Sequence, residues 1–243
     1  MKIITHYILL IASLFAALPA FAVVPDLSVY PTESSLEISV DSEVKEVSAN
    51  VEFAKIGKIN TATILDNPDR GIAIKAPEPG LNNITLCGAA KISGQNGVIR
   101  IIEYGAGNLI TLGYRLGAQV TDGEYKLQLL MVGSPEVTRK DGLNNFCIIN
   151  SKKTFPCGDW IFFAVVMNRT GKAEMFVNGE PVASESIQIL EKDDMSIGAR
   201  TYISTHEDSG DISMEFAGIE VYYTLLSSVE IEKISLKTKG LPF

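Results

Sequence analysis

WIFFAVVM, Trp160–Met167, is the longest uninterrupted apolar run after residue 22. A run of this length forms a strand and is far shorter than the ~20 residues needed to cross a hydrocarbon core. Apolar side chains stand at both odd and even positions, so both faces of the strand must be covered. The stretch therefore predicts a central strand of a sheet, with a second element packed on its outer face.

Turn signals after this stretch predict that it belongs to a three-stranded meander. Asn178-Gly179 separates the segments 173–177 and 181–183. Both central positions of a type I′ turn need positive φ, which Asn and Gly tolerate, so this pair predicts a tight hairpin. A looser turn at 168–171, with sequence NRTG, connects the apolar run to segment 173–177.

Short apolar or alternating segments, separated by Gly, Asn, Asp and Pro, extend along most of the chain. No long segment shows the 3.6-residue period of an amphipathic helix, so the predicted fold class is all-β, a two-sheet antiparallel sandwich. Ser227-x-x-Glu230 fits a capping box and predicts one short helix over 229–234. The expected strands are 36–40, 44–54, 71–75, 84–92, 98–104, 109–116, 125–132, 146–149, 160–167, 173–177, 195–198 and 212–225.

The composition excludes several classes of function. The 243 residues are 46% hydrophobic and 21% charged, which is typical of a globular protein. The formal net charge of -8 opposes binding to the phosphates of nucleic acid. Two histidines and three cysteines leave little material for a zinc cluster, an iron–sulfur site or a multi-histidine metal centre.

The N-terminal segment 1–22 has the organisation of a signal peptide. A basic start at Lys2 precedes the apolar stretch 8–18, and the small-x-small sequence AFA ends at Ala22. A membrane anchor is the alternative, but the apolar stretch is shorter than a membrane span. We therefore expect cleavage after Ala22 and a periplasmic or secreted protein. Later apolar runs are too short for membrane insertion.

Three segments of the C-terminal half share the pattern of one family of sandwiches. They are DWIFFAVV at 159–166, MFVNGEPV at 175–182 and FAGIEVYY at 216–223. The succession of a Trp, an apolar strand and an aromatic residue followed by Val-Asn-Gly resembles the laminin-G-like, concanavalin A-like lectin and glucanase jelly rolls. The resemblance implies a jelly-roll sandwich over 45–236, after an N-terminal strand and lead-in at 23–44 and before a tail at 237–243.

The catalytic pattern of the glucanases that the chain resembles is missing. Those enzymes carry a Glu-x-Asp-x-x-Glu strand, in which one carboxylate attacks the anomeric carbon and another protonates the leaving oxygen. The Glu-x-Asp of this chain, Glu191-Lys192-Asp193, lacks the third carboxylate and is interpreted as a charged turn. His206, the sole histidine after residue 22, has no nucleophile motif beside it. We therefore expect no enzymatic activity.

Two sets of residues are candidates for ligand binding. Sugar binding on a sandwich uses exposed aromatic faces beside planar polar side chains, so tyrosines and arginines come first. Carboxylates gather in a loop between two strands, where extracellular calcium sites are often assembled, and a solvated loop is the alternative interpretation. The candidate sugar-binding residues are Tyr104, Tyr114, Arg115, Arg200 and Tyr202. The candidate calcium ligands are Glu207, Asp208 and Asp211.

The expected export of the protein bears on the oxidation state of its three cysteines. Cys147 and Cys157 flank a short loop, and an exported protein folds under oxidising conditions, so we expect a disulfide between them. Cys87 lies within a predicted strand and is expected to be a buried thiol.

The sequence favours a secreted, non-catalytic binding module, with an extracellular carbohydrate as the first choice of ligand. One alternative is a cell-envelope module that docks on protein or has a structural role, and another is a glycan-cleaving enzyme whose carboxylates the spacing does not reveal. A groove lined by Tyr and Arg favours sugar, and an apolar patch favours protein. Two carboxylates ~5 to 9.5 Å apart across a cleft favour hydrolysis.

Overall fold

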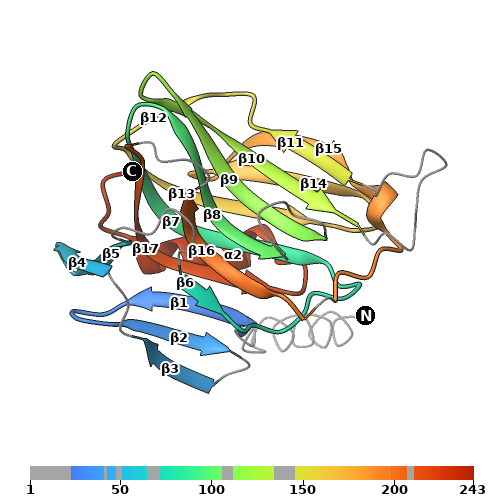
Figure 1. The fold of residues 1–243 in the computed structure, drawn as a ribbon, viewed down its shortest axis with the longest axis horizontal. Coiled ribbons are helices and arrows are strands. Elements are labelled where there is room, and N and C mark those ends of the chain that lie inside the picture. The colour runs from blue at the N-terminus through green and yellow to red at the C-terminus, as the bar shows by residue number, and fades with distance from the viewer. Residues whose placement is uncertain are drawn as a thin grey trace, which may run out of the picture.

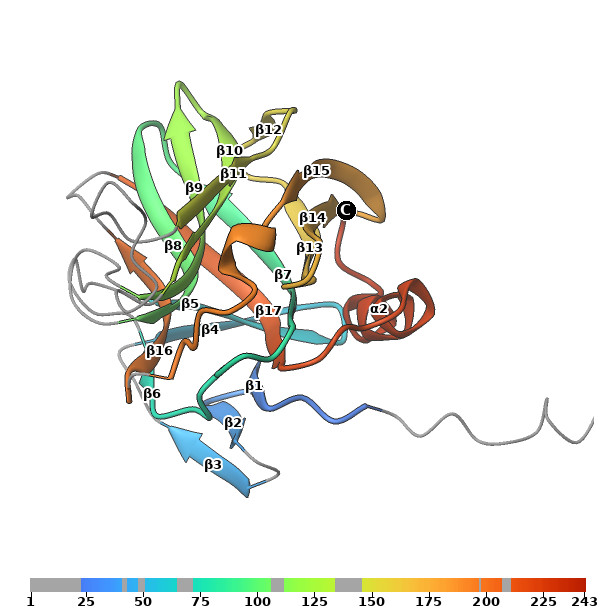
Figure 2. The ribbon, with the colours of Figure 1, turned by 90° about the vertical axis from the view of Figure 1, so that its right-hand side faces the viewer.

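The computed structural model describes residues 23–40, 43–47, 51–64, 72–105, 112–133, 146–196, 198–206 and 211–243. These residues form two antiparallel sheets, A and B, packed face to face (Figure 1). A short helix lies on the outer side of sheet A, away from sheet B (Figure 2). The predicted all-β sandwich with one short helix near the C-terminus is confirmed.

Sheet A contains the first and the last described strands of the chain. Its strands are β1 (Leu27–Pro31), β2 (Leu36–Val40), β3 (Glu43–Val47), β4 (Val51–Ile56), β5 (Ile59–Ile64), β7 (Ile84–Ser93), β13 (Trp160–Met167), β14 (Lys172–Val177), β15 (Glu180–Ser186) and β17 (Ser213–Tyr222). They lie in the order β15-β14-β13-β7-β17-β1-β2-β3, and the β4–β5 hairpin joins through β5, which pairs with β17. β17 therefore lies between β7 and β1.

Sheet B is the smaller sheet and comes mostly from the middle of the chain. Its strands are β6 (Ile72–Ile74), β8 (Gly97–Gly105), β9 (Gly113–Thr121), β10 (Glu124–Val132), β11 (Phe146–Asn150), β12 (Phe155–Pro156) and β16 (Arg200–His206). They lie in the order β11-β10-β9-β8-β16-β6, and β12 pairs with β10. The helical elements are η1 (Gln188–Leu190), α2 (Ser228–Ser235) and η2 (Leu236–Thr238).

One apolar core fills the space between the sheets. In β9, Tyr114, Leu116 and Ala118 are buried in this core, whereas Gln119 on the opposite parity is exposed. The alternation follows from the pleat, which sends successive side chains to opposite faces. The outer face of sheet B is therefore polar at β9, whereas Phe146 and Ile148 of β11 are exposed apolar side chains on that same face.

β13 is the central, doubly covered strand that the apolar run predicts. It pairs with β7 on one side and β14 on the other. Phe163 packs in the core between the sheets, and Phe162 and Ala164 pack on the opposite face in a second cluster with Ile234 of α2. The helix and the chain end thus cover the outer face of sheet A, which confirms the prediction.

Two local signals also give the expected structure. Ser227 is the N-cap of α2, and its hydroxyl accepts from the Glu230 backbone N–H at 3.3 Å. The Ser227 N–H in return donates to Glu230 Oε2 at 2.7 Å, which completes the capping box. Asn178 and Gly179 have φ of 51° and 82° and join β14 to β15, as a tight turn with positive φ requires.

One strand prediction is wrong in position, and another is confirmed only in part. Residues 195, 196 and 198 lie outside any strand, and the strand of this region is β16, which begins at Arg200. β16 escaped prediction because its core-facing residues include a fully buried Thr201 beside Ile203, so its apolar signal is weak. Of the segment expected at 109–116, residues 109–111 lie outside the described residues, and residues 113–116 begin β9, which continues to Thr121.

The predicted disulfide between Cys147 and Cys157 is wrong. Cys147 lies opposite Met131 near one end of β10, whereas the Cys157 N–H donates to the Gly123 carbonyl beyond the other end. A strand rises about 3.4 Å per residue, so some eight residues of β10 separate the two thiols by over ~20 Å. A disulfide needs Cα atoms within ~7 Å. Both thiols are free, and Cys87 is a buried free thiol as predicted.

The expected signal peptide at 1–22 lies outside the described residues. Among the residues that are described, no helix is long and apolar enough to cross a membrane.

Candidate ligand-binding face

The outer face of sheet B brings together three of the five predicted sugar-binding residues. Tyr202 of β16 and Arg115 of β9 each lie directly opposite Glu103 of β8. Residues opposite each other in antiparallel strands point to the same face, with Cβ atoms ~4.5–5.5 Å apart. The three side chains therefore form a row across the sheet, and Arg200 lies on the same face because it is two residues from Tyr202.

A bulge in β8 adds Arg100 to this face. The register between β8 and β9 shifts between Arg100 and Ile102, so Ile101 is an extra residue. Residues three apart in a regular strand point to opposite faces, and the extra residue brings Arg100 and Glu103 to the same one. Arg100 Nη1 lies 3.2 Å from Glu103 Oε2, and the two side chains are 13% and 2% exposed.

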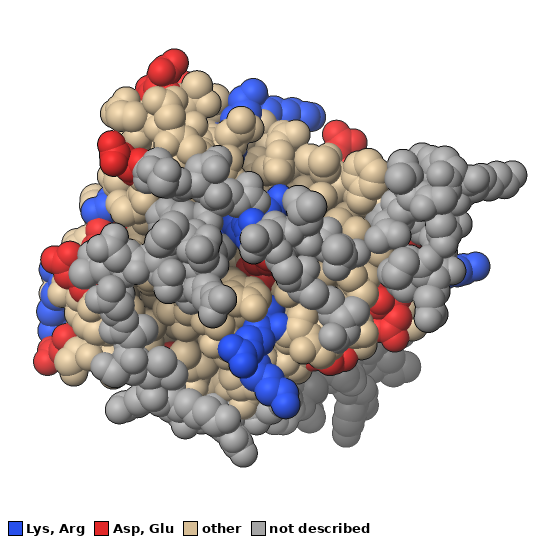
Figure 3. Space-filling view, in the orientation of Figure 1, with Lys and Arg blue, Asp and Glu red and all other residues tan. Residues whose placement is uncertain are grey.

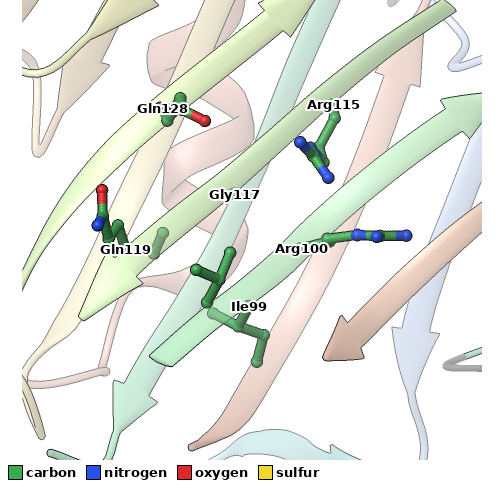
Figure 4. A pocket seen from close by; sticks show the side chains of 8 residues that line it. Ile99, Arg100, Arg115, Gly117, Gln119 and Gln128 are labelled. Carbon is green, nitrogen blue, oxygen red and sulfur yellow. The ribbon is translucent and has the colours of Figure 1, made fainter. Parts of the chain in front are cut away.

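A small hollow lies on this face between β8, β9 and β10 (Figure 4). Gly117 of β9 lies opposite Arg100 on one side and Gln128 on the other. A Cβ at this position would come within 2.8 Å of the Ile99 carbonyl oxygen, so only glycine fits without a shift of the backbone. The hollow has a volume of about 150 Å³, and its polar lining consists of Arg100, Arg115, Gln119 and Gln128.

The hollow presents planar polar groups on both sides of a glycine. Figure 4 shows Arg100 and Arg115 on one side of Gly117 and Gln119 and Gln128 on the other. A guanidinium is a fixed fork of donors, and a primary amide both donates and accepts, so these groups suit a ligand rich in hydroxyl or carboxylate oxygens. Basic side chains gather near the middle of this face (Figure 3), although the whole chain has a net charge of -8.

The prediction that Tyr104 and Tyr114 bind sugar is wrong. Both are 0% exposed in the core between the sheets, where their rings stack with centroids 5.9 Å apart. Burial raises the pKa of Tyr114 well above its ordinary value, because a phenolate there would lose its hydration. A ring with no accessible face cannot stack on a sugar, so these tyrosines are packing residues.

The candidate calcium ligands are only partly described. Glu207 and Asp208 lie outside the described residues, and Asp211 is exposed. Within the described ranges, no group of three or more His, Cys, Asp or Glu residues is arranged to hold a metal ion.

The charged turn expected at Glu191-Lys192-Asp193 is confirmed. The segment follows η1, and Asp193 is fully buried. Arg169, also buried, donates to the carbonyl oxygens of Leu190 and Asp193 and so fixes this turn. The Glu-x-Asp pair is therefore a structural part of the turn and does not face the hollow.

No family model matches the chain, and no curated protein matches it in sequence. Solved structures do match it. The binding domain of Paraclostridial Mosquitocidal Protein 1 is 14% identical with a TM-score of 0.65, and the match covers 86% of this chain and 51% of that one. The botulinum neurotoxin serotype G binding domain is 12% identical with a TM-score of 0.60, over 88% of this chain and 51% of that one.

These likenesses establish the fold. The chain spans about half the length of the solved structures that it matches. Its fold is a β-sandwich of the kind present in those binding domains. The match does not single out the laminin-G-like or concanavalin A-like families that the sequence resembles.

Proposed function

We propose that the protein is an exported, non-catalytic binding module that takes a carbohydrate on the outer face of sheet B. The observation that carries the proposal is the polar hollow around Gly117. Guanidinium and amide groups stand on strands whose backbone hydrogen bonds are already made, so the backbone that carries them is fixed before a ligand arrives. The volume of about 150 Å³ is on the scale of one sugar ring rather than a whole chain.

Tyr202 supplies the aromatic part of the proposed site. Its side chain is half-buried on the same face, one strand away from Glu103. An aromatic face beside planar polar groups is the usual arrangement for sugar recognition, because the ring covers C–H surface while the polar groups bind hydroxyls.

The same hollow supports binding rather than turnover. Its described lining contains no carboxylate. Glu103, the nearest acid by register, is almost fully buried and paired with Arg100. Hydrolysis of a glycoside needs one carboxylic acid and one carboxylate on either side of the bond, and the described residues of the hollow do not provide this pair.

A glycan array followed by titration calorimetry tests the proposal. Arg115→Lys keeps the charge but removes the fork of donors, and we expect it to weaken binding about tenfold. Tyr202→Ala should weaken binding by about fivefold or more. Arg200→Lys is the matched control, because Arg200 is on the same face but lies opposite Gly105, farther from the hollow along β8 than Tyr202, and it should change affinity less than about twofold.

Other outcomes would contradict the proposal. Failure to bind any glycan would exclude the carbohydrate function, and release of reducing ends by highly purified protein would exclude the non-catalytic one. Tyr114→Phe should leave affinity unchanged, because this ring is in the core.

A further inference from the structure

A second and larger concave surface lies on the opposite side of the molecule, on the outer face of sheet A. It is a groove of about 810 Å³ between β13–β14 and the segment that runs from α2 to the chain end. This volume is within the range of ~300–1,000 Å³ that is typical of small-molecule sites. The floor includes Phe162, Ala164 and Phe176, and the wall includes Ile231, Leu236 and Phe243.

Apolar surface is continuous from the floor of this groove to its rim. Phe162 is 6% exposed at the floor, whereas Leu236 and Phe243 at the rim are 56% and 51% exposed. Large apolar side chains that remain half exposed beside an apolar cavity lose contact with water only when something fills it. The groove therefore favours a ligand with a long apolar body.

The hydrogen bonding of the floor excludes strand addition by an extended peptide. β13 is paired with β7 and β14, and β14 is paired with β13 and β15, so neither strand has a free edge. The Asn178 side chain, which also lines the groove, already accepts from the Phe162 N–H at 2.8 Å. A peptide strand laid here would bury backbone groups without partners, which costs ~1–3 kcal/mol for each. A hydrocarbon chain has no such groups.

The charges at the groove balance each other. Glu174, on the floor opposite Val166, forms an ion pair with Lys172 at 2.8 Å. Glu232 and Lys239 also line the groove and bring one negative and one positive charge. This balance favours a head group that carries both signs rather than a purely anionic or cationic one.

A buried polar cluster holds the wall of the groove in place. Lys237, next to Leu236, binds Glu220 of β17 with its Nζ 2.5 Å from Oε1. Tyr222 donates to the other carboxylate oxygen at 2.7 Å, and Tyr30 of β1 donates to Oε1. Burial and the nearby carboxylate keep the pKa of Tyr30 far above its ordinary value, so its phenol stays a donor. The wall is therefore anchored to sheet A through Glu220.

We propose that this groove binds a single aliphatic chain of a zwitterionic amphiphile, with the chain along β13 and the head group near Glu232 and Lys239. The site is separate from the hollow on sheet B, and the proposal does not rest on carbohydrate binding.

The test uses a homologous series of alkyl sulfobetaines below their critical micelle concentrations, titrated into the protein by calorimetry. Each methylene that enters the groove should raise the affinity about fourfold until the groove is full. Equal affinity for short and long chains, or no binding at all, would overturn the proposal. If the natural occupant is a docked protein helix, no sulfobetaine should bind.

Paired variants assign the binding to the groove. Leu236→Glu places a charge on the rim and should weaken the longest bound sulfobetaine about tenfold. Val229→Glu is the matched control, because Val229 is on the same helical segment, 59% exposed and outside the lining, and it should have no effect. Equal weakening by both would count against the groove.

A further variant fills the cavity. Val166→Trp projects a large ring from β13 into the groove and should abolish binding, whereas Ala54→Trp, at an exposed position of β4, should leave it unchanged. If Val166→Trp does not fold, the pair Leu236→Glu and Val229→Glu decides the matter alone.

Discussion

The outer faces of the two sheets differ in their exposure to solvent. Around Gly117, sheet B leaves its outer face to polar side chains and has a small hollow of about 150 Å³ lined by arginines and glutamines. Sheet A covers its outer face with α2 and the chain end and has an apolar groove of about 810 Å³. The covering helix, rather than the sheet, therefore decides which kind of ligand a face can bind. β13 can be apolar at both parities only because α2 packs on it.

The largest loss of stability is expected from a substitution on the covered face of sheet A. Phe162→Asp would bury a carboxylate between β13 and α2 at a position that is 6% exposed. We expect a loss of about 4 kcal/mol or more in the free energy of unfolding, enough to unfold most of the protein. Urea denaturation followed by circular dichroism measures it. A variant as stable as wild type would mean that α2 does not cover this strand.

The second largest loss of stability is expected in the polar cluster of Glu220 beneath the C-terminal segment. Glu220→Ala removes the acceptor shared by Tyr30, Tyr222 and Lys237, and we expect a cost of about 2–3 kcal/mol. Glu180→Ala is the control, because its pair with Lys153 is exposed on both sides and should contribute less than about 0.5 kcal/mol. Equal effects from the two variants would exclude a structural role for the cluster.

The cap of α2 should have a smaller, pH-dependent effect. Ser227→Ala should cost about 1 kcal/mol near neutral pH. Hydrogen bonds from the Ser227 side chain and backbone lower the pKa of Glu230 below its ordinary 4.5. A carboxyl whose pKa is lowered by folding stabilises the folded state above its unfolded pKa, and this contribution is lost as pH falls through the folded value. Thermal melts should therefore show the difference between variant and wild type shrinking below about pH 4.

The smallest change in stability is expected for a substitution on the outer face of sheet B. Gln119→Asp introduces the same charge as Phe162→Asp, but on an exposed position of β9. We expect a change in stability within about 0.5 kcal/mol, because the carboxylate stays hydrated. A loss comparable to that of Phe162→Asp would show that something covers sheet B as α2 covers sheet A.

The parts of the fold that the sequence predicts are those with strong local signals. The Asn178-Gly179 turn and the Ser227-x-x-Glu230 cap each depend on neighbouring residues, and both were predicted correctly. The disulfide prediction failed because it used spacing along the chain. The distance between Cys147 and Cys157 is set instead by their registers on β10, which no local pattern contains.

The candidate site was predictable by residue type and only partly by position. Arg115, Arg200 and Tyr202 share the face that carries the hollow. Tyr114 could have been rejected from the sequence, because it precedes Arg115 in one strand and so points to the opposite face. Gln119 shares the parity of Arg115 and could have been added in the same way. Arg100 and Glu103 required knowledge of the bulge in β8, and Gln128 required the pairing of β10 with β9.

The position of β17 between β1 and β7 determines when sheet A can be completed during folding. β17 is synthesised after both of its neighbours in the sheet, and the Tyr30–Glu220 contact joins residues 190 positions apart. Until β17 is made, the edges of β1 and β7 that it will occupy are open to other chains. Sheet A cannot be completed before this strand is made, so we expect folding to be slow and vulnerable to aggregation until β17 has emerged.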